Sequence, residues 1–307
     1  MTGFGIEPRN CFKFMTIGID IGGTNIKGVL FGKGRVLARI KIRTKSKSDR
    51  KILIAQIFEC IEFLFKKDKK VERIGIGVAG PVDFKNQKVL NPPNVTGLKG
   101  LYLAKLVEKR FKIKTIVDND VHGLVLAEAI LGAGKNKKLV VGLGLGTGVG
   151  GGIVLNKKIL HGARGTAGEI GHMIIKRGGR KCSCGSKGCL EIYISERGIR
   201  KTAEEIFGQE IDTITLHEIA KGKNKKAIKI WQITGEYLGI GLANIVDNLN
   251  PDIIVIGGGI AGAGEFLLKP ARKEMRKNIL SPLARKTPVV RAKLGEYAGA
   301  IGAALLV

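Results

Sequence analysis

The chain is poor in cysteine and in aromatic residues: five of its 307 residues are Cys, and 5% are Phe, Trp or Tyr. So little cysteine excludes a disulfide-stapled scaffold, and so few aromatics leave no stacking platform for nucleic-acid bases. The longest uncharged apolar run, residues 139–155, is shorter than a membrane span and contains seven glycines. The N-terminal residues show no basic segment followed by an apolar one, as a secretory signal would. We therefore expect a cytoplasmic protein with no membrane partner.

Acidic residues are scarce as well. The chain has 53 Lys and Arg against 26 Asp and Glu, a formal charge of +27. A basic surplus can bind nucleic acid by neutralising phosphates. Here it lies in short lysine runs typical of a solvated surface, at residues 66–70, 135–138 and 223–226. We expect no nucleic-acid partner, although the surplus can steer an anionic nucleotide toward the protein.

The length allows two domains with separate cores. A weak internal repeat supports two related α/β halves: residues 17–31 and 139–155 both read as strand, glycine turn, strand. Each half also contains a later apolar strand that ends in glycines, at 73–83 and 252–262.

Apolar spacing predicts helices over residues 50–66, 121–131 and 230–249. The lysine-rich stretch before the third helix, 221–229, reads as a loop or an exposed helix. The first helix is expected to bury one face, which makes Cys60 a core residue rather than a reactive thiol. The second is expected to be capped by a residue of 118–120 and to present an apolar face made of Val121, Leu124, Val125 and Leu131.

Glycine is abundant, with 45 residues, and glycine turns can cradle phosphates because their backbone N–H groups converge on an anion. Two G-x-G-x-x-G spacings begin at Gly75 and Gly146. Neither is followed by a helix, so neither fits a dinucleotide fingerprint. One turn remains in each half, at 21–24 and at 146–148, and each is either a phosphate loop or a tight hairpin.

Three of the five cysteines lie within eight residues and follow a histidine. His172, Cys182, Cys184 and Cys189 supply one imidazole and three thiolates, the ligand set of a closed tetrahedral zinc site. The intervening Arg, Lys and Gly residues exclude a buried core segment. With all four positions filled by protein, we expect a structural Zn²⁺ that fixes the flanking Glu169 and Glu191 rather than one that performs chemistry.

Eight segments taken together resemble the ROK family of sugar kinases and repressors, and most of all its bacterial-type glucokinase branch. The resemblance runs from residue 16 to about residue 305. The segments are DIGGTNIKG (20–28), VAGPVD (78–83), PNVTG (93–97), DND (118–120), GLGTGVGGG (144–152), GEIGH (168–172), CSCGSKGCLE (182–191) and NPDIIVIGGG (250–259).

This resemblance implies an α/β fold of the actin-like ATPase type, with two RNase H-like domains flanking a cleft. The smaller N-terminal domain would comprise residues 1–118 plus 293–307. The larger domain, 119–292, would carry the zinc-binding loop. Relatives commonly pair, so a homodimer or homotetramer is expected.

The resemblance also assigns roles to individual residues. It makes Asp120 the catalytic base, and it puts the acidic Asp20 near Mg²⁺ and the phosphates. Without it, Asp20 would read as a strand-end turn residue. The sugar-binding positions are Asn94, Asn119, Asp120, Glu169, His172 and Glu191. The phosphate loops are Gly22, Gly23, Thr24 and Gly146, Thr147, Gly148, while Gly257 and Gly258 would hold the adenosine portion of ATP.

The expected function is ATP-dependent phosphorylation of a hexose, first of all glucose to glucose 6-phosphate. Leu98 stands where many relatives carry an aromatic residue, so N-acetylglucosamine, N-acetylmannosamine, fructose and mannose remain alternative substrates. A ROK-type sugar-responsive transcriptional regulator is disfavoured because only 19 residues precede Asp20, fewer than a helix-turn-helix domain needs. A sugar-binding module without catalysis is disfavoured by Asp120. The first 14 residues have no family counterpart, and Met15 is a possible alternative start.

Overall fold

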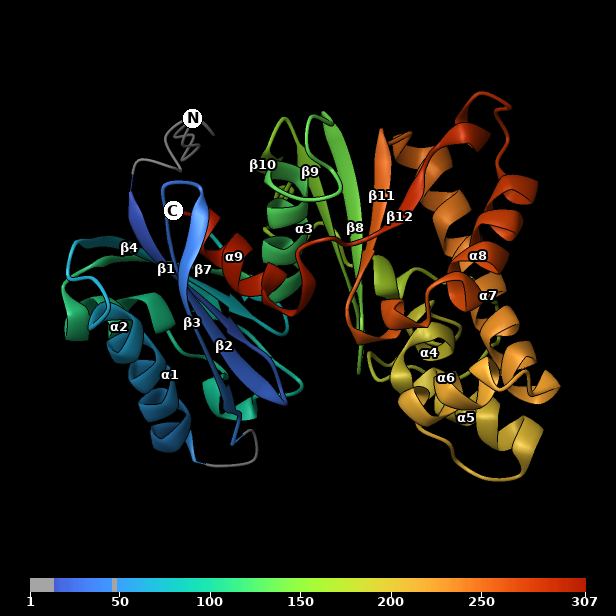
Figure 1. Cartoon of the computed structure of the whole chain (residues 1–307), viewed down its shortest axis with the longest axis horizontal. Helices are drawn as coiled ribbons and strands as arrows, with labels where there is room; N and C mark the ends of the chain where they lie inside the picture. Colours follow the sequence, from blue (N-terminus) through green and yellow to red (C-terminus); the bar gives the residue numbers. More distant parts are fainter. Residues whose placement is uncertain (1–13, 46–48) are drawn as a thin grey trace. The chain divides into compact units, whose positions relative to one another are not determined.

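The computed structural model describes residues 14–45 and 49–307 and forms two compact units (Figure 1). Unit 1 holds the described residues up to Asn136 together with Ile153–Ala167 and Lys293–Val307, and unit 2 holds Lys137–Gly152 and Gly168–Ala292. Residues 1–13, which make up most of the segment without a family counterpart, lie outside the described residues. Residues 119–136 and 153–167 group with unit 1, in which the helix at 120–130 packs on the C-terminal helix.

Unit 1 is built on a five-stranded sheet in the order β3-β2-β1-β4-β7. The first three strands form an antiparallel meander, and β4 and β7 then run parallel to β1. The strands are β1 (Met15–Ile21), β2 (Asn25–Gly32), β3 (Arg35–Arg43), β4 (Val71–Val78) and β7 (Lys114–Asn119), with a short hairpin of β5 (Val82–Asp83) and β6 (Lys88–Val89).

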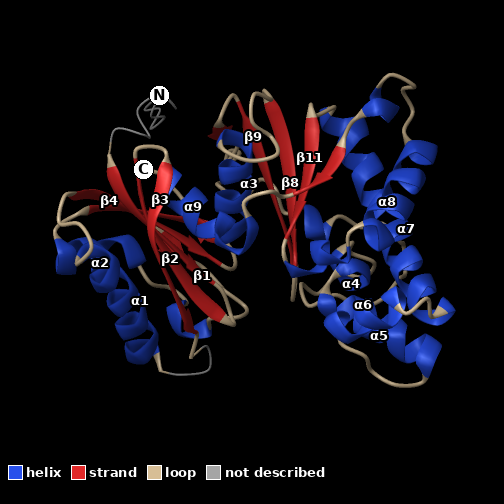
Figure 2. Cartoon of the chain, in the orientation of Figure 1, coloured by secondary structure: helices blue, strands red, loops and turns tan. Residues whose placement is uncertain are grey.

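Helices flank this sheet (Figure 2). They are α1 (Arg50–Phe65), α2 (Leu103–Phe111), α3 (Asp120–Ile130) and α9 (Ala298–Leu305), with the 3-10 turns η1 (Thr96–Leu98) and η5 (Gly295–Tyr297). The predicted face of α1 is confirmed, since Leu53, Ile57, Cys60, Ile61 and Leu64 are all buried. The predicted face of α3 is wrong: Val121 and Leu124 are only partly buried, while residues 125–130 are buried all round. Because α3 packs against both α9 and β4, it has no single apolar stripe.

The C-terminal helix lies unusually close to the sheet. A Cβ atom on Gly18 of β1 would come within 1.9 Å of the Ala300 carbonyl oxygen, and one on Gly75 of β4 within 1.8 Å of the Ala303 carbonyl oxygen. A Cβ on Gly302 of α9 would likewise lie 1.6 Å from the Gly123 carbonyl oxygen of α3. These glycines are therefore required by close packing, and Gly75, the first glycine of the first G-x-G-x-x-G spacing, has a structural role.

Unit 2 contributes most of a second five-stranded sheet, ordered β10-β9-β8-β11-β12. Here β11 runs parallel to both β8 and β12. The strand order repeats that of the first sheet, so the two related halves predicted from the repeat are confirmed. The strands are β8 (Leu139–Leu145), β9 (Val149–Leu155), β10 (Lys158–Ile159), β11 (Ile253–Gly257) and β12 (Val289–Arg291).

The helices of unit 2 include a long pair, α7 and α8, that pack against each other. α7 begins at Lys225, five residues before its predicted start, because Asn224 caps its first turn, and it ends at a left-handed Asn250. The elements are α4 (Glu191–Ile194), α5 (Glu196–Phe207), α6 (Thr213–Lys221), α7 (Lys225–Leu249), α8 (Glu265–Asn278), η2 (Ile170–His172), η3 (Gly259–Ala263) and η4 (Ala284–Lys286). Among the described residues, no helix has both the length and the apolar character that crossing a bilayer requires.

The contact between β4 and α9 predicts the effect of one added methyl group. Gly75→Ala should destabilise the protein by about 1–3 kcal/mol, because the new Cβ would overlap backbone that cannot move away. Gly262→Ala is the matched control, since a Cβ there meets nothing within 4 Å. Urea unfolding measures both variants, and equal midpoints would contradict the packing argument.

Candidate active site

In unit 1, three candidate residues lie at the carboxyl edge of the parallel strands β1, β4 and β7. Asp20 lies near the end of β1 and pairs in register with Gly77 of β4, while Asn119 ends β7 opposite Val78 of β4. Asp120 follows as the first residue of α3. Side chains at this edge converge because the strands are parallel, and this edge is where open α/β sheets bind ligands.

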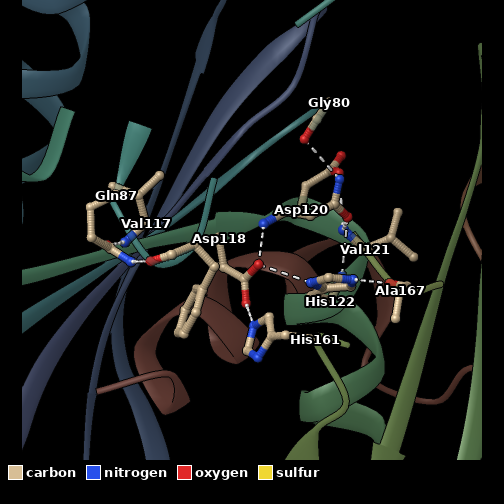
Figure 3. Close-up of polar contacts among 11 residues, drawn as sticks. Gly80, Gln87, Val117, Asp118, Asp120, Val121, His122, His161 and Ala167 are labelled. Carbon is tan, nitrogen blue, oxygen red and sulfur yellow. Dashed lines mark hydrogen bonds and ion pairs between the residues drawn. The ribbon is translucent and has the colours of Figure 1, made fainter. Parts of the chain in front are cut away.

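The junction between β7 and α3 is held by hydrogen bonds to the main chain. The Asn119 side chain caps α3, accepting from the N–H groups of Val121 at 2.8 Å and His122 at 3.3 Å. Its amide nitrogen donates to the Gly80 carbonyl oxygen at 3.0 Å (Figure 3). The predicted cap within 118–120 is thus its middle residue, and it leaves the Asp120 carboxylate at the edge of the sheet.

Asp20 is the strongly perturbed acid of this site. Burial, and next the negative charge of Asp120, raise the pKa of Asp20 from 3.8 to about 7, although Lys27 on β2 opposes the shift. Gly299, at the start of α9, lies so close that a Cβ there would be 2.7 Å from the Asp20 Oδ2 atom. Two carboxylates so close that the charge of one raises the pKa of the other fit a site for a cation.

The first glycine turn lies beside Asn94. The Gly22 N–H closes the β1–β2 turn by donating to the Asn25 carbonyl oxygen at 3.0 Å. A Cβ on Gly23 would lie 2.7 Å from the Cβ of Asn94, and Thr24 is exposed. The structure therefore brings Asn94 and this turn together within unit 1.

In unit 2, the four candidate metal ligands meet. The donor atoms of His172, Cys182, Cys184 and Cys189 all lie within 4.8 Å of one another. Cys184 Sγ is 3.6 Å from Cys189 Sγ, and Cys182 Sγ is 3.8 Å from His172 Nδ1. A disulfide would need about 2.05 Å, whereas ligands bonded to one tetrahedral zinc ion lie about 3.6–3.8 Å apart. The donor set therefore fits a metal ion.

Glycines shape the loop that carries the cysteines. Gly185 and Gly188 have φ of +98° and +81°, and a Cβ on Gly188 would lie 1.8 Å from the Lys176 carbonyl oxygen. Hydrogen bonding by the Ser186 backbone lowers the pKa of the exposed Cys184 thiol to about 7, whereas burial raises that of Cys189 to about 12. The Cys184 thiol therefore loses its proton more readily than that of Cys189, whose proton a bound metal would have to displace.

Glu191 joins this cluster to the second glycine turn. One carboxylate oxygen accepts the Val149 N–H at 2.9 Å, and the other lies 3.7 Å from Cys182 Sγ. Glu191 is buried, and a Cβ on Gly148 would lie 2.8 Å from its Oε2. Glu169 differs, because its side chain is exposed at the start of η2.

The nucleotide candidates of unit 2 gather at the carboxyl ends of β8 and β11. Gly144 pairs with Gly257 in register, and Gly258, with φ of +85°, packs against the Leu145 backbone. The turns at 146–148 and 257–258 are therefore neighbours. A pocket of about 430 Å³ adjoins the turn at 146–148. It is lined by Thr147, Glu196, Arg197, Arg200, Lys201, Glu204 and Glu210.

Sequence reasoning missed two groups of residues. Arg197, Arg200 and Lys201 share one face of α5 beside Thr147, and their i, i+3, i+4 spacing was a usable signal. The second missed group is a cluster in unit 1 formed by Asp118, His122 and His161 (Figure 3). The i, i+4 spacing of the first two was readable, but nothing in the sequence links His161, 39 residues further on, to them.

Comparison with known proteins agrees with this architecture. The model of the ROK family matches residues 16–307. The chain belongs to the ROK family. A glucokinase from Halalkalibacterium halodurans is 34% identical over 95% of this chain and 94% of its own length. The crystal structure of a ROK glucokinase from Streptomyces griseus with glucose and AMPPNP superposes with a TM-score of 0.83, at 32% identity, covering 95% of this chain and 99% of that chain.

Other ROK relatives have different activities. An N-acetyl-D-glucosamine kinase from Photobacterium profundum is 32% identical over 95% of this chain and 99% of its own length. A xylose repressor from Bacillus spizizenii is 30% identical over 95% of this chain, which spans 76% of the repressor. The full-length kinship to kinases identifies this ROK protein as a sugar kinase, and the shared structure confirms the actin-like ATPase fold.

The raised pKa of Asp20 predicts a pH-dependent change in stability. Because its folded-state pKa of about 7 exceeds its ordinary 3.8, the bound proton stabilises the fold fully below about pH 4, and this stabilisation is lost as the pH rises through 7. Asp20→Asn mimics the protonated acid. Its gain in Tm should be near zero at about pH 4 and several degrees at pH 8. Glu72→Gln, on the exposed end of β4, is the control, and a gain from Asp20→Asn that is the same at every pH would contradict the assignment.

The cysteine cluster predicts a linked loss of metal and stability. Cys184→Ser should lose most of its bound metal and melt several degrees lower, because ion binding contributes to the folding free energy of unit 2. Cys60→Ala is the control. It removes a buried cysteine outside the cluster, so it should keep its full metal content. Elemental analysis and thermal melting measure both. Unchanged metal content in Cys184→Ser would refute the site.

Proposed function

We propose that the protein transfers the γ-phosphoryl group of ATP to a hexose, first of all to the 6-hydroxyl of glucose. The observation that carries this proposal is the Asp120 carboxylate at the carboxyl edge of the first sheet, close enough to Asp20 to raise its pKa. An Asp so placed can accept the proton of a substrate hydroxyl.

In the proposed reaction, Asp120 takes the hydroxyl proton while the sugar oxygen forms a bond to the γ-phosphorus. The bond from that phosphorus to the bridging oxygen breaks, and ADP leaves. Backbone N–H groups of Gly23 and Thr24 and of Thr147 and Gly148 hold the phosphates, and the backbone at Gly257 and Gly258 holds the adenosine portion. Mg²⁺, when bound with the nucleotide, neutralises phosphate charge. Asp20 is the carboxylate best placed to coordinate it.

The hydroxyl groups of the sugar require a set of polar partners. We assign this task to Asn94 and Asn119 of unit 1 and to Glu169, His172 and Glu191 of unit 2. A site that pairs with each hydroxyl discriminates strongly against analogues that lack one. The N-acetylglucosamine kinase relative keeps that substrate as an alternative, along with N-acetylmannosamine, fructose and mannose.

We assign the metal cluster to a structural Zn²⁺ held by His172, Cys182, Cys184 and Cys189. The spacing of the sulfur and nitrogen atoms supports this choice, since thiolates favour zinc over Mg²⁺. Through the contact between Cys182 and Glu191, a bound ion would fix a carboxylate that also accepts the Val149 N–H. Its proposed role is to orient His172 and Glu191.

A sugar-responsive regulator is the second candidate, favoured by the similarity to a xylose repressor. Sequence-selective DNA binding with a steep salt dependence would support it. The kinase proposal carries with it a cytoplasmic location and a role at the entry to glycolysis. A homodimer or homotetramer stays a prediction.

A coupled phosphoryl-transfer assay over a panel of hexoses and phosphoryl donors tests the kinase proposal. Asp120→Ala should lower kcat by at least about 100-fold, because no other group would take the hydroxyl proton. Glu72→Gln should leave kcat unchanged. Turnover that is indifferent to Asp120→Ala would remove the proposed base.

A further inference from the structure

A buried cluster in unit 1 lies beside the proposed base and has no part in the reaction as described. Asp118 is 1% exposed. Its Oδ1 atom accepts the Asn119 N–H at 2.7 Å and faces His122 Nδ1 at 2.8 Å, while its Oδ2 atom faces His161 Nε2 at 2.7 Å (Figure 3). Burial alone would raise the pKa of Asp118, but the hydrogen bonds from the two histidines outweigh it and lower that pKa.

His122 faces a hydrogen-bond acceptor at each ring nitrogen. Its Nδ1 atom faces the Asp118 carboxylate, and its Nε2 atom lies 3.2 Å from the Ala167 carbonyl oxygen. Both contacts can be hydrogen bonds at the same time only when both ring nitrogens carry protons. Removing either Asp118 or His122 would leave the other buried polar group without this partner.

The bond between Asp118 and His122 spans the proposed base. Asp118 is the last residue but one of β7, and His122 lies in the first turn of α3. Asp120 is midway between them, so this bond and the Asn119 cap together close a small loop around it. These hydrogen bonds on both sides restrain the backbone of Asp120.

His161 fixes the other carboxylate oxygen of Asp118. Its ring stacks on Phe84, in the turn between β5 and β6, with centroids 3.8 Å apart and planes at 17°. The ring is thereby oriented so that its Nε2–H points at Oδ2. The Asp118 carboxylate is held from two sides, and its plane is set by residues far away in the sequence.

A metal ion is the main competing occupant, since the three donor atoms lie within 4.8 Å of one another. The nitrogen–oxygen distances of 2.7 and 2.8 Å are those of direct hydrogen bonds. Ligands bonded to one ion at about 2.1 Å lie about 3.0 Å apart or more. The geometry favours hydrogen bonds, and metal binding becomes an outcome of the test.

We propose that His161 is a positioning residue for Asp120, acting through Asp118 and His122 to hold the base in the orientation that takes the hydroxyl proton. This inference rests on the proposed kinase function. A base misplaced by about 1 Å loses on the order of 100-fold in rate. The effect belongs to kcat rather than to substrate binding, because His161 is none of the residues assigned to the sugar or the nucleotide.

A matched pair of substitutions tests this proposal. Asp118 and His122 are poor targets because their loss can prevent folding, whereas the His161 side chain is 21% exposed. His161→Gln keeps an N–H donor near the position of Nε2 but loses the aromatic stack, and His161→Phe keeps the stack but loses the donor. We expect His161→Phe to lower kcat by about 10- to 100-fold with both KM values within about twofold, and His161→Gln to restore kcat to within about threefold of the wild type.

Three results would overturn the proposal. An equal loss of kcat in both variants would indicate packing alone, and an unchanged kcat in His161→Phe would remove the link to Asp120. A second equivalent of metal in the wild type that His161→Phe loses would make the cluster a metal site. Asp120→Ala, assayed alongside, separates the two proposals: if it is inactive while His161→Phe is fully active, positioning fails alone, and if it is fully active, the proposed function fails and positioning fails with it.

Discussion

The chemistry of unit 1 depends on one constraint: the fold holds the carboxylates of Asp20 and Asp120 close enough to repel each other. Asp20 on β1 and Asp120 after β7 are separated by one strand, β4, and Gly77 on that strand leaves room because a Cβ there would lie 3.1 Å from the Asp120 Cα. Burial and this repulsion raise the pKa of Asp20 to about 7. The arrangement costs stability, and close packing of α9 on β1 and β4 holds it in place. The two acids are thereby placed to bind a cation and to accept a proton.

Unit 2 solves a related problem with a different device. Its sheet has the same strand order as that of unit 1, but here the carboxyl ends of β8 and β11 carry glycine turns in place of acids. A buried carboxylate of this unit, Glu191, links the cysteine cluster to the start of β9 by accepting the Val149 N–H. Duplicated strands therefore support two chemistries, because the loops after the strands differ while the sheet does not.

Much of the fold could be predicted because it depends on local pattern. The buried face of α1 follows from 3.6-residue periodicity, and the duplicated sheets follow from the repeated glycine hairpins. The face of α3 could not be predicted, because a helix covered by both α9 and β4 has no polar side. The role of Gly75 was also hidden, since only the returning C-terminal helix makes a Cβ there impossible. The site divides in the same way: the cysteine spacing announced the cluster, whereas His161 reaches Asp118 across 43 residues and only the fold reveals the contact.

The central claim is that the fold keeps Asp20 and Asp120 close enough to share a field, and a carboxyl ¹³C NMR titration of Asp20 tests it most directly. In the wild type the account predicts a pKa of about 7, with a clear fall in Asp120→Asn because the neighbouring negative charge is gone. An ordinary pKa near 3.8 in the wild type, or one that Asp120→Asn leaves unchanged, would contradict it.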